Sequence, residues 1–254
     1  PELCCQSVVI TDAEPELAEA EALQMAQVFW KQRELMQPEL MDMDQAVDKA
    51  NKIPGPVIFT DAADATSSGA TGDSNALLEA LIEGDFSGEV LAPIVDPSAA
   101  YMAHSAGIGQ KLQVVIGGAL DSRYPPLELE VTVEKLGDGE YPLESSGTPE
   151  HAGPSAVLRC GNYTIVCLSR SVRFIDRSPF LAHDINPEDF DLIIVKSPHC
   201  EPRFFDDWAE CNFNIDSPGS TSANLKTLGH KICGRPLYPL DSEVNFTPSS
   251  ETYQ

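Results

Sequence analysis

The chain has 254 residues, enough for one large domain or two small ones with a substantial hydrophobic core. Its formal net charge is −24, from 40 acidic and 16 basic residues, and a field of that sign repels nucleic acid and anionic membrane surfaces. No apolar run approaches the roughly 20 residues of a membrane-spanning helix, so we expect neither nucleic acid nor a membrane as a partner.

The first fifty residues predict one strand and two helices. Residues 7–10 form an apolar run typical of a short buried strand, and a long helix is expected to begin at Asp12 or Glu14 and to end at about Met36. A second helix is expected over 42–52, before a Pro-Gly-Pro break at 54–56 that we interpret as a domain boundary. Because such a unit cannot bury its own apolar face, and because the chain begins with Pro and not Met, we expect a fragment that lacks its partner domain.

From residue 56 the pattern alternates between strand and helix, which is typical of an α/β domain. The sequence predicts strands over 57–60, 89–95 and 111–117, and helices over 74–83 and 97–106. Asp96-Pro97 favours the start of the second helix, because Pro suits the first helical turn.

In the second half of the chain the sequence pattern predicts more strands and hairpins than helices. Residues 127–135 alternate like a half-exposed strand, and 156–159 with 163–169 predict a hairpin that turns at Gly161-Asn162. A buried strand is expected over 192–196, a helix over 204–209 and a disordered tail over 242–254. We therefore predict an α/β fold with a mixed sheet and flanking helices, and with more antiparallel strands and hairpins in its second half.

The cysteines indicate the redox compartment. There are seven, an odd number, and no two of them form a Cys-x-x-Cys pair. Buried free thiols are the expected state, which predicts a reducing, cytoplasmic location.

The segment 56–82 carries the most chemistry, because a strand leads through a small-residue loop into a helix. Asp61, Asp64 and Asp73 lie in that loop, and no Lys follows Gly72, so the P-loop pattern is not met. Carboxylates here can bind protons, cations or backbone donors; turn and N-cap bonds are the alternative for Asp61 and Asp64, and we expect Asp73 to cap the following helix.

Further candidates follow later strands. Lys196 and Ser197 end a buried strand, where α/β folds place ligand contacts, so Lys196 could neutralise a substrate carboxylate and His199 could move a proton. The alternative is that Lys196 pairs with an acidic neighbour and His199 caps a helix. For Arg170 and Arg173, structural ion pairs are expected. Asp216 and Thr221 lie in a turn that either lines a cleft or only reverses the chain.

Several short motifs resemble, in order and spacing, the C-terminal half of the microcystinase C-like metallopeptidases. The matching pieces are Asp61…Asp64 with Gly69-Ala70-x-Gly72-Asp73, Asp96-Pro97, Ala106-Gly107-x-Gly109, Gly117-Gly118, Pro126-Leu127-Glu128, Gly153-Pro154-x-Ala156-Val157-Leu158-Arg159, Ser169-Arg170, Val195-Lys196-Ser197, Asp216-x-Pro218-Gly219-x-Thr221-Ser222 and Arg235-Pro236-x-x-Pro239-Leu240-Asp241.

The resemblance covers about residues 56–241 and departs from the family pattern in two places. The family's Asp-Asn-Pro-Gly-Gly-Gly is replaced by Asp64-Ala65-Thr66-Ser67-Ser68-Gly69, and the loss of two glycines restricts backbone conformation there. The family's His in Lys-Ser-x-x-His-Phe stands one position early, at His199.

The resemblance implies a division into three parts. Residues 1–53 look like the last βα unit of the family's N-terminal domain with a linker, 54–241 form the C-terminal α/β domain, and 242–254 are the tail. It also implies a zinc-dependent hydrolase acting on peptide or amide bonds, with its Asp and His zinc ligands in the N-terminal domain. That domain is the expected partner, together with a small peptide or amide substrate.

This chain itself is expected to hold neither the zinc nor a catalytic residue. It has five histidines, none of them spaced i, i+4, and no His-Glu-x-x-His motif. The expected contribution is substrate binding. The candidate residues are Asp61, Asp64, Lys196, Ser197, His199, Asp216 and Thr221. Two alternatives remain, a non-catalytic α/β binding module that keeps the cleft without the metal site and a carboxylate-rich cation site unrelated to hydrolysis.

Overall fold

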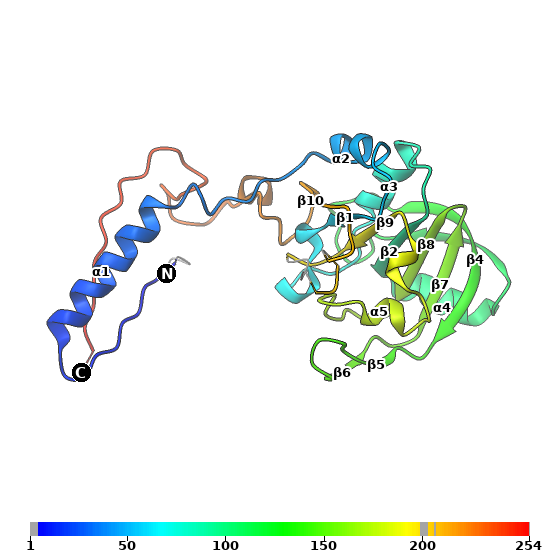
Figure 1. Cartoon of the computed structure of the whole chain (residues 1–254), viewed down its shortest axis with the longest axis horizontal. Helices are drawn as coiled ribbons and strands as arrows, with labels where there is room; N and C mark the ends of the chain where they lie inside the picture. The colour runs from blue at the N-terminus through cyan, green and yellow to red at the C-terminus, as the bar shows by residue number, and fades with distance from the viewer. Residues whose placement is uncertain (1–4, 199–202, 206, 254) are drawn as a thin grey trace. The chain divides into compact units, whose positions relative to one another are not determined.

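A mixed sheet of eight strands forms the centre of the larger part of the chain (Figure 1). The computed structural model describes residues 5–198, 203–205 and 207–253, and divides the chain into one unit of residues 40–224 and another of residues 1–39 with 225–254. The compact sheet unit thus begins at Leu40, ahead of the predicted boundary at Pro54, because α2 (Met43–Ala50) buries Ala46, Val47 and Ala50 in its core.

The strand order is β10-β1-β9-β2-β8-β7-β4-β3. In that order the strands are Cys211–Asn214, Val57–Thr60, Leu192–Val195, Val90–Val95, Tyr163–Leu168, Ser155–Cys160, Leu127–Gly137 and Lys111–Ile116. The strands from β10 to β8 run parallel, while β7, β4 and β3 add antiparallel pairs. The predicted α/β class with antiparallel strands in the second half is therefore confirmed.

Helices and loops cover both faces of the sheet. On one face α2, α3 (Ala76–Glu83) and α4 (Pro97–Ala106) pack in a single apolar cluster with the strands. On the other face α5 (Ser178–Leu181) packs with the hairpin of β5 (Glu140–Pro142) and β6 (Pro149–His151) and with loop aromatics. Four short 3-10 helices, η1 to η4, complete the described elements. They are Ala62–Asp64, Thr66–Ser68, Pro187–Asp189 and Leu225–Leu228.

Local sequence signals explain several of these elements. The Asp96 side chain accepts a hydrogen bond from Ala99 N at 2.9 Å and caps α4, while Asp42 caps α2 in the same way. Gly161 takes a φ of +57° in the two-residue turn between β7 and β8, as a tight hairpin requires. Continuous burial of β1, β2, β8 and β9 follows from helices or loops on both sides.

The structure corrects four expectations about secondary structure. Residues 7–10 form no strand, since Val8 and Ile10 are exposed and Ser7 Oγ instead donates to Ala22 O. The first helix, α1, spans Pro15–Lys31 and gives way to i→i+3 turns before residue 36. Of the described residues in 204–209, all but Ala209 form turns and none is helical, and strand β10, which the sequence did not predict, pairs with β1.

The unit of residues 1–39 and 225–254 is held by an aromatic cluster. The ring of Trp30 stacks on Phe246 at 4.7 Å between centroids and meets Tyr238 edge-on, while the Arg33 guanidinium lies over Trp30. No residue of α1 is buried. Residues 242–253 contain no helix or strand, and the disorder of this tail stays a prediction.

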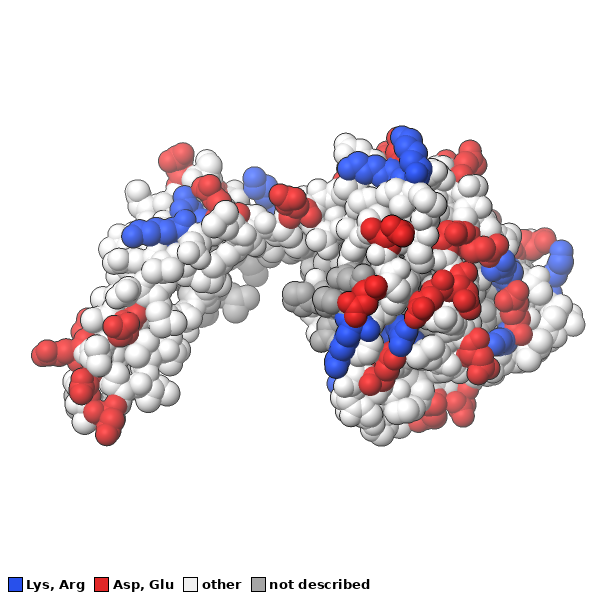
Figure 2. All heavy atoms as spheres, in the orientation of Figure 1, with Lys and Arg blue, Asp and Glu red and all other residues white. Residues whose placement is uncertain are grey.

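Acidic side chains predominate on the face of the molecule shown in Figure 2, as the composition requires. Within the described chain, no helix combines the length and the apolar character needed to cross a bilayer.

A buried histidine ties α5 to β7. His183 Nε2 lies 2.8 Å from Ser155 Oγ, and Nδ1 lies 2.8 Å from Pro179 O. A neutral ring with its proton on Nδ1 donates to the carbonyl and accepts from the hydroxyl, which satisfies both contacts. Burial lowers the pKa of His183 below its usual value, because the charged ring would be desolvated.

This histidine should make stability depend on pH. The native ring binds a proton less readily than the unfolded ring, so the free energy of unfolding should fall as pH drops below about 6.5, by at most about 1.4 kcal/mol per pH unit. Urea unfolding between about pH 7.5 and 5.5 should give a steeper decrease for the wild type than for His183→Gln. The exposed His230→Gln serves as control and should keep the wild-type slope. Equal slopes for all three proteins would contradict the assignment.

Candidate functional site

The carboxyl ends of the parallel strands bring several ionisable side chains to one edge of the sheet. Asp61 follows β1, Lys196 follows β9 and Asp96 follows β2. After β2 the chain continues to β3, at one end of the sheet, whereas after β9 it continues to β10, at the opposite end. Such a divergence of connections marks the place where open α/β sheets form their ligand crevice.

Lys196 lies at the centre of this edge. Its ammonium donates to Asp64 Oδ2 at 2.8 Å and to Ser74 O at 2.8 Å, with Asp61 Oδ2 at 3.4 Å. The side chains of Lys196, Asp61 and Asp64 are all at most 2% exposed. The structure thus shows the acidic pairing that the sequence left as an alternative for Lys196, and the ammonium faces carboxylates and not solvent.

Burial and charge act in opposite directions on this triad. Burial penalises the Lys196 ammonium, but Asp64 and Asp61 outweigh it, so the pKa of Lys196 is raised. Burial also raises the pKa of Asp61, assisted by the negative charge of Asp64 and opposed by Lys196. The triad carries one positive and up to two negative charges, and the raised pKa of Asp61 means that this carboxyl takes up a proton more readily than an ordinary aspartate as pH falls.

Asp64 organises the loop that follows β1. Its Oδ1 accepts from Gly72 N at 2.9 Å, and its Oδ2 accepts from Ser74 N at 2.8 Å. The loop from η1 to the start of α3 therefore closes on one buried carboxylate. This is the backbone bonding that the sequence offered as an alternative for Asp64, combined with the ion pair.

The turn over 216–222 locks onto the same loop. Ser217 Oγ donates to Asp61 Oδ1 at 2.6 Å, and Thr221 Oγ1 lies 2.8 Å from Ala62 O while accepting from Ala65 N at 3.2 Å. Asp216 instead accepts from Asn224 Nδ2 at 2.9 Å and does not join the triad. Ser217 is a contact of the candidate site that the sequence did not single out, although the Pro-Gly turn beside Thr221 was a signal for it.

The remaining candidates lie as follows. Ser197 is buried beside Lys196, and its backbone N donates to Val195 O at 2.9 Å. His199 lies outside the described residues. Asp73 does not cap α3, contrary to our expectation, because its Oδ2 accepts from Leu120 N and Asp121 N and so anchors a neighbouring loop.

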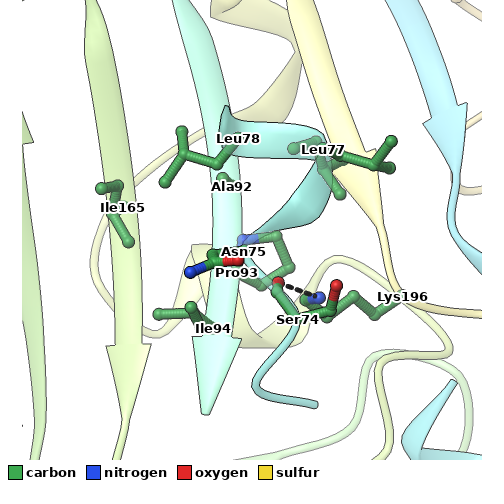
Figure 3. Close-up of a pocket in the computed structure, with 10 residues that line it drawn as sticks. Ser74, Asn75, Leu77, Leu78, Ala92, Pro93, Ile94, Ile165 and Lys196 are labelled. Atoms are coloured by element: carbon green, nitrogen blue, oxygen red, sulfur yellow. Dashed lines mark hydrogen bonds between the residues drawn. The ribbon is translucent and has the colours of Figure 1, made fainter. Parts of the chain in front are cut away.

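A small cavity opens where β2 and β9 separate (Figure 3). These strands pair only at Val90–Leu192 and Leu91–Ile193 before Pro93, which has no N–H to donate. The volume of this cavity that the centre of a water molecule can reach is about 10 Å³. The cavity wall includes Ser74 and the Lys196 side chain. It has room for one water molecule and none for a peptide.

The described residues do not fit a zinc ion. No three His, Cys, Asp or Glu side chains group as metal ligands in residues 5–198, 203–205 and 207–253. Asp61 and Asp64 are already bonded, and the Lys196 ammonium occupies the position that a cation would take between them. That arrangement also removes support from the hypothesis of a carboxylate-rich cation site.

Three of the described histidines are engaged in other contacts. His104 Nε2 lies 3.0 Å from Ser155 O, His183 is bonded within the fold, and His151 pairs with Glu140. A catalytic zinc needs about three protein ligands at one point, and these side chains supply no such set.

Three kinds of comparison with known proteins give matches. The sequence profile of the family described as MlrC C-terminus matches residues 59–231. Microcystinase C of Sphingomonas sp is 36% identical over 63 residues, which are 25% of this chain and 12% of that protein. The crystal structure of a protein from Mesorhizobium sp. BNC1, provisionally named a metallopeptidase, superimposes with a TM-score of 0.79 at 25% identity.

The chain is short beside these relatives. The superposition covers 91% of this chain but 47% of the Mesorhizobium chain. Thus the fold described above corresponds to about half of the solved protein.

Proposed function

Since the chain belongs to the MlrC C-terminus family, we propose that it forms one wall of the substrate cleft of a zinc-dependent hydrolase that acts on peptide or amide bonds. Its relatives make it a peptidase-related domain. The observation that carries the proposal is the match of the family profile over 59–231, together with the superposition on the Mesorhizobium protein.

The zinc is proposed to lie on a part of the protein that these 254 residues do not include. The described residues contain no group of three His, Cys, Asp or Glu side chains that could hold a metal ion, and more than half of the Mesorhizobium chain has no counterpart here. On this proposal, the remaining half supplies the metal ligands and the activated water, and it is also the main partner of this chain. A small peptide or amide is the proposed substrate.

The geometry suits a rigid wall. Lys196, Asp61 and Asp64 join the ends of β1 and β9 to two loops, and Thr221 holds the turn over 216–222 against the loop after β1. A cleft wall must keep its shape so that the substrate stays aligned with the reacting groups. We propose that the buried triad positions this edge, and that substrate contacts come from more exposed residues beside it.

A cytosolic location without nucleic-acid or membrane partners is part of the proposal. All described cysteines are free, which suits a reducing compartment. The charge of −24 disfavours polyanions and anionic lipid surfaces.

The test joins the two halves. Mixing the purified chain with the separately expressed remaining half of the Mesorhizobium protein should give an assembly that hydrolyses short peptides and loses that activity with a zinc chelator. The chain alone should hold less than one zinc per molecule in metal analysis after dialysis, and should not hydrolyse the peptides. One tightly held zinc in the isolated chain would contradict the assignment of the ligands. A stable assembly that binds peptides without hydrolysing them would favour a non-catalytic binding module.

A further inference from the structure

Arg170 stands apart from the other arginines of this acidic protein. Six of the other arginines pair with a carboxylate, namely Arg33, Arg123, Arg159, Arg173, Arg177 and Arg235. The guanidinium of Arg203 lies over the ring of Phe204. Among the described residues, the Arg170 side chain contacts no carboxylate, although the chain has 40 acidic residues. The ion pair that we expected forms at Arg173, which meets Glu150, and not at Arg170.

The position of Arg170 is built into the fold. It lies two residues beyond the end of β8, at the edge where the parallel strands end, and its backbone N donates to Ala152 O at 2.9 Å. A Cβ on Gly153 would lie 3.3 Å from Arg170 Cγ and 3.4 Å from Cδ, so the stem of the arginine packs over this glycine. The residue is nonetheless exposed, which leaves its charged end available to solvent and ligands.

The segment around Arg170 is tied to the loop that follows β1. Thr66 Oγ1 donates to Val172 O at 2.5 Å. The next residues of that loop, Ser67, Ser68 and Gly69, are exposed, and the two serines present hydroxyl groups there, while the backbone N–H groups of Ser68 and Gly69 donate to Ala65 O and Thr66 O within the loop. The Arg170 guanidinium, which meets no carboxylate among the described residues, and the exposed polar stretch Ser67 to Gly69 thus belong to the same edge as the proposed cleft wall.

We propose that Arg170 binds a carboxylate of the peptide substrate, an inference that rests on the proposed function. A guanidinium presents two parallel N–H donors that match both oxygens of a carboxylate. Lys196 cannot take this role because its ammonium is buried between Asp61 and Asp64. The acidic protein repels anions at long range, so an arginine that meets no described carboxylate provides a local site where an anionic group can bind.

Binding to the full 254-residue chain tests this directly. N-acetyl-Ala-Ala carries a terminal carboxylate, N-acetyl-Glu-Ala-amide carries a side-chain carboxylate, and N-acetyl-Ala-Ala-amide carries neither. Titration followed by amide NMR shifts near Arg170 should show at least one acidic peptide binding about ten-fold more tightly than the neutral one. The acidic peptide that binds more tightly identifies whether the terminal or the side-chain carboxylate is recognised.

Three variants separate contact from bulk charge. Arg170→Gln should weaken the acidic peptide about ten-fold or more, and Arg170→Lys should restore part of the affinity. Arg173→Gln removes the same charge three residues along the chain and should leave the affinity unchanged, since Arg173 already pairs with Glu150. Circular dichroism of the exposed Arg170 variants should match the wild type.

The outcomes distinguish this inference from the proposed function. Equal affinity of Arg170→Gln and the wild type for the acidic peptides, or equal binding of the neutral peptide, would overturn the inference. If the assembled halves hydrolyse peptides at a rate that depends neither on Arg170 nor on a carboxylate in the substrate, the inference is overturned and the proposed hydrolase function is supported. Arg170-dependent binding without any hydrolysis would support it while contradicting the hydrolase.

Discussion

Replacing the buried Lys196 by Met should lower the free energy of unfolding by about 3–5 kcal/mol. Met keeps the length of the side chain but removes the ammonium that faces Asp61 and Asp64, so two carboxylates lose their cation in a dry environment. The loss should be smaller at low pH, since Asp61 already has a raised pKa and can become neutral. Urea unfolding of both proteins at neutral and acidic pH measures the difference.

A matched control uses an exposed lysine. Lys111 meets Glu130 at 3.4 Å, and both side chains are more than half exposed, so Lys111→Met should change stability by about 0.5 kcal/mol or less. Adding Asp64→Asn to Lys196→Met should recover part of the loss, because one buried charge is removed. Similar stability of Lys196→Met and Lys111→Met would show that the triad does not hold the edge of the sheet.

Substituting Gly219 by Ala should cost about 2–3 kcal/mol of unfolding free energy. A Cβ at this position would lie 2.1 Å from Ala63 O, and that oxygen accepts the Thr221 backbone N–H at 3.0 Å. The clash is with backbone, so the turn over 216–222 must move away from the loop after β1. Displacement of that turn should also break the bond between Ser217 and Asp61.

The adjacent residue provides the comparison. Ser220→Ala deletes a hydroxyl from the same turn without adding an atom near Ala63, and it should change stability by about 0.5 kcal/mol or less. Thermal unfolding of the two variants against the wild type measures both effects. A Gly219→Ala protein as stable as Ser220→Ala would contradict the close approach of the two loops.

The elements that sequence reasoning located best are those with local signals. Strand 57–60 and helix 97–106 match β1 and α4 to the residue, because an unbroken apolar run and an Asp-Pro start are written in consecutive positions. Strand β10 was missed because the residues of Cys211–Asn214 are not a continuous apolar run. Strand β10 forms because it pairs with the open edge of β1, and the sequence of residues 211–214 alone does not indicate this pairing.

The candidate site shows the same division. Asp61, Asp64, Lys196 and Thr221 could be chosen from the sequence because each belongs to a polar motif just after a predicted strand or in a Pro-Gly turn. Their partners could not be chosen, since Lys196 meets Asp61 and Asp64 across 135 and 132 residues of sequence. Arg170 and Arg173 were indistinguishable in sequence, and only the position of Glu150 separates them.

The sequence by itself determined the α/β class, most element positions, the acidic surface and the resemblance that led to the family. Those properties depend on composition and on neighbouring residues, whose periodicity and capping act over one or two turns of backbone. Tertiary structure alone decided which charges neutralise one another and which arginine stays available. Burial and pairing depend on strands that meet only when the sheet forms, because the energy of a charge is set by the groups around it in space.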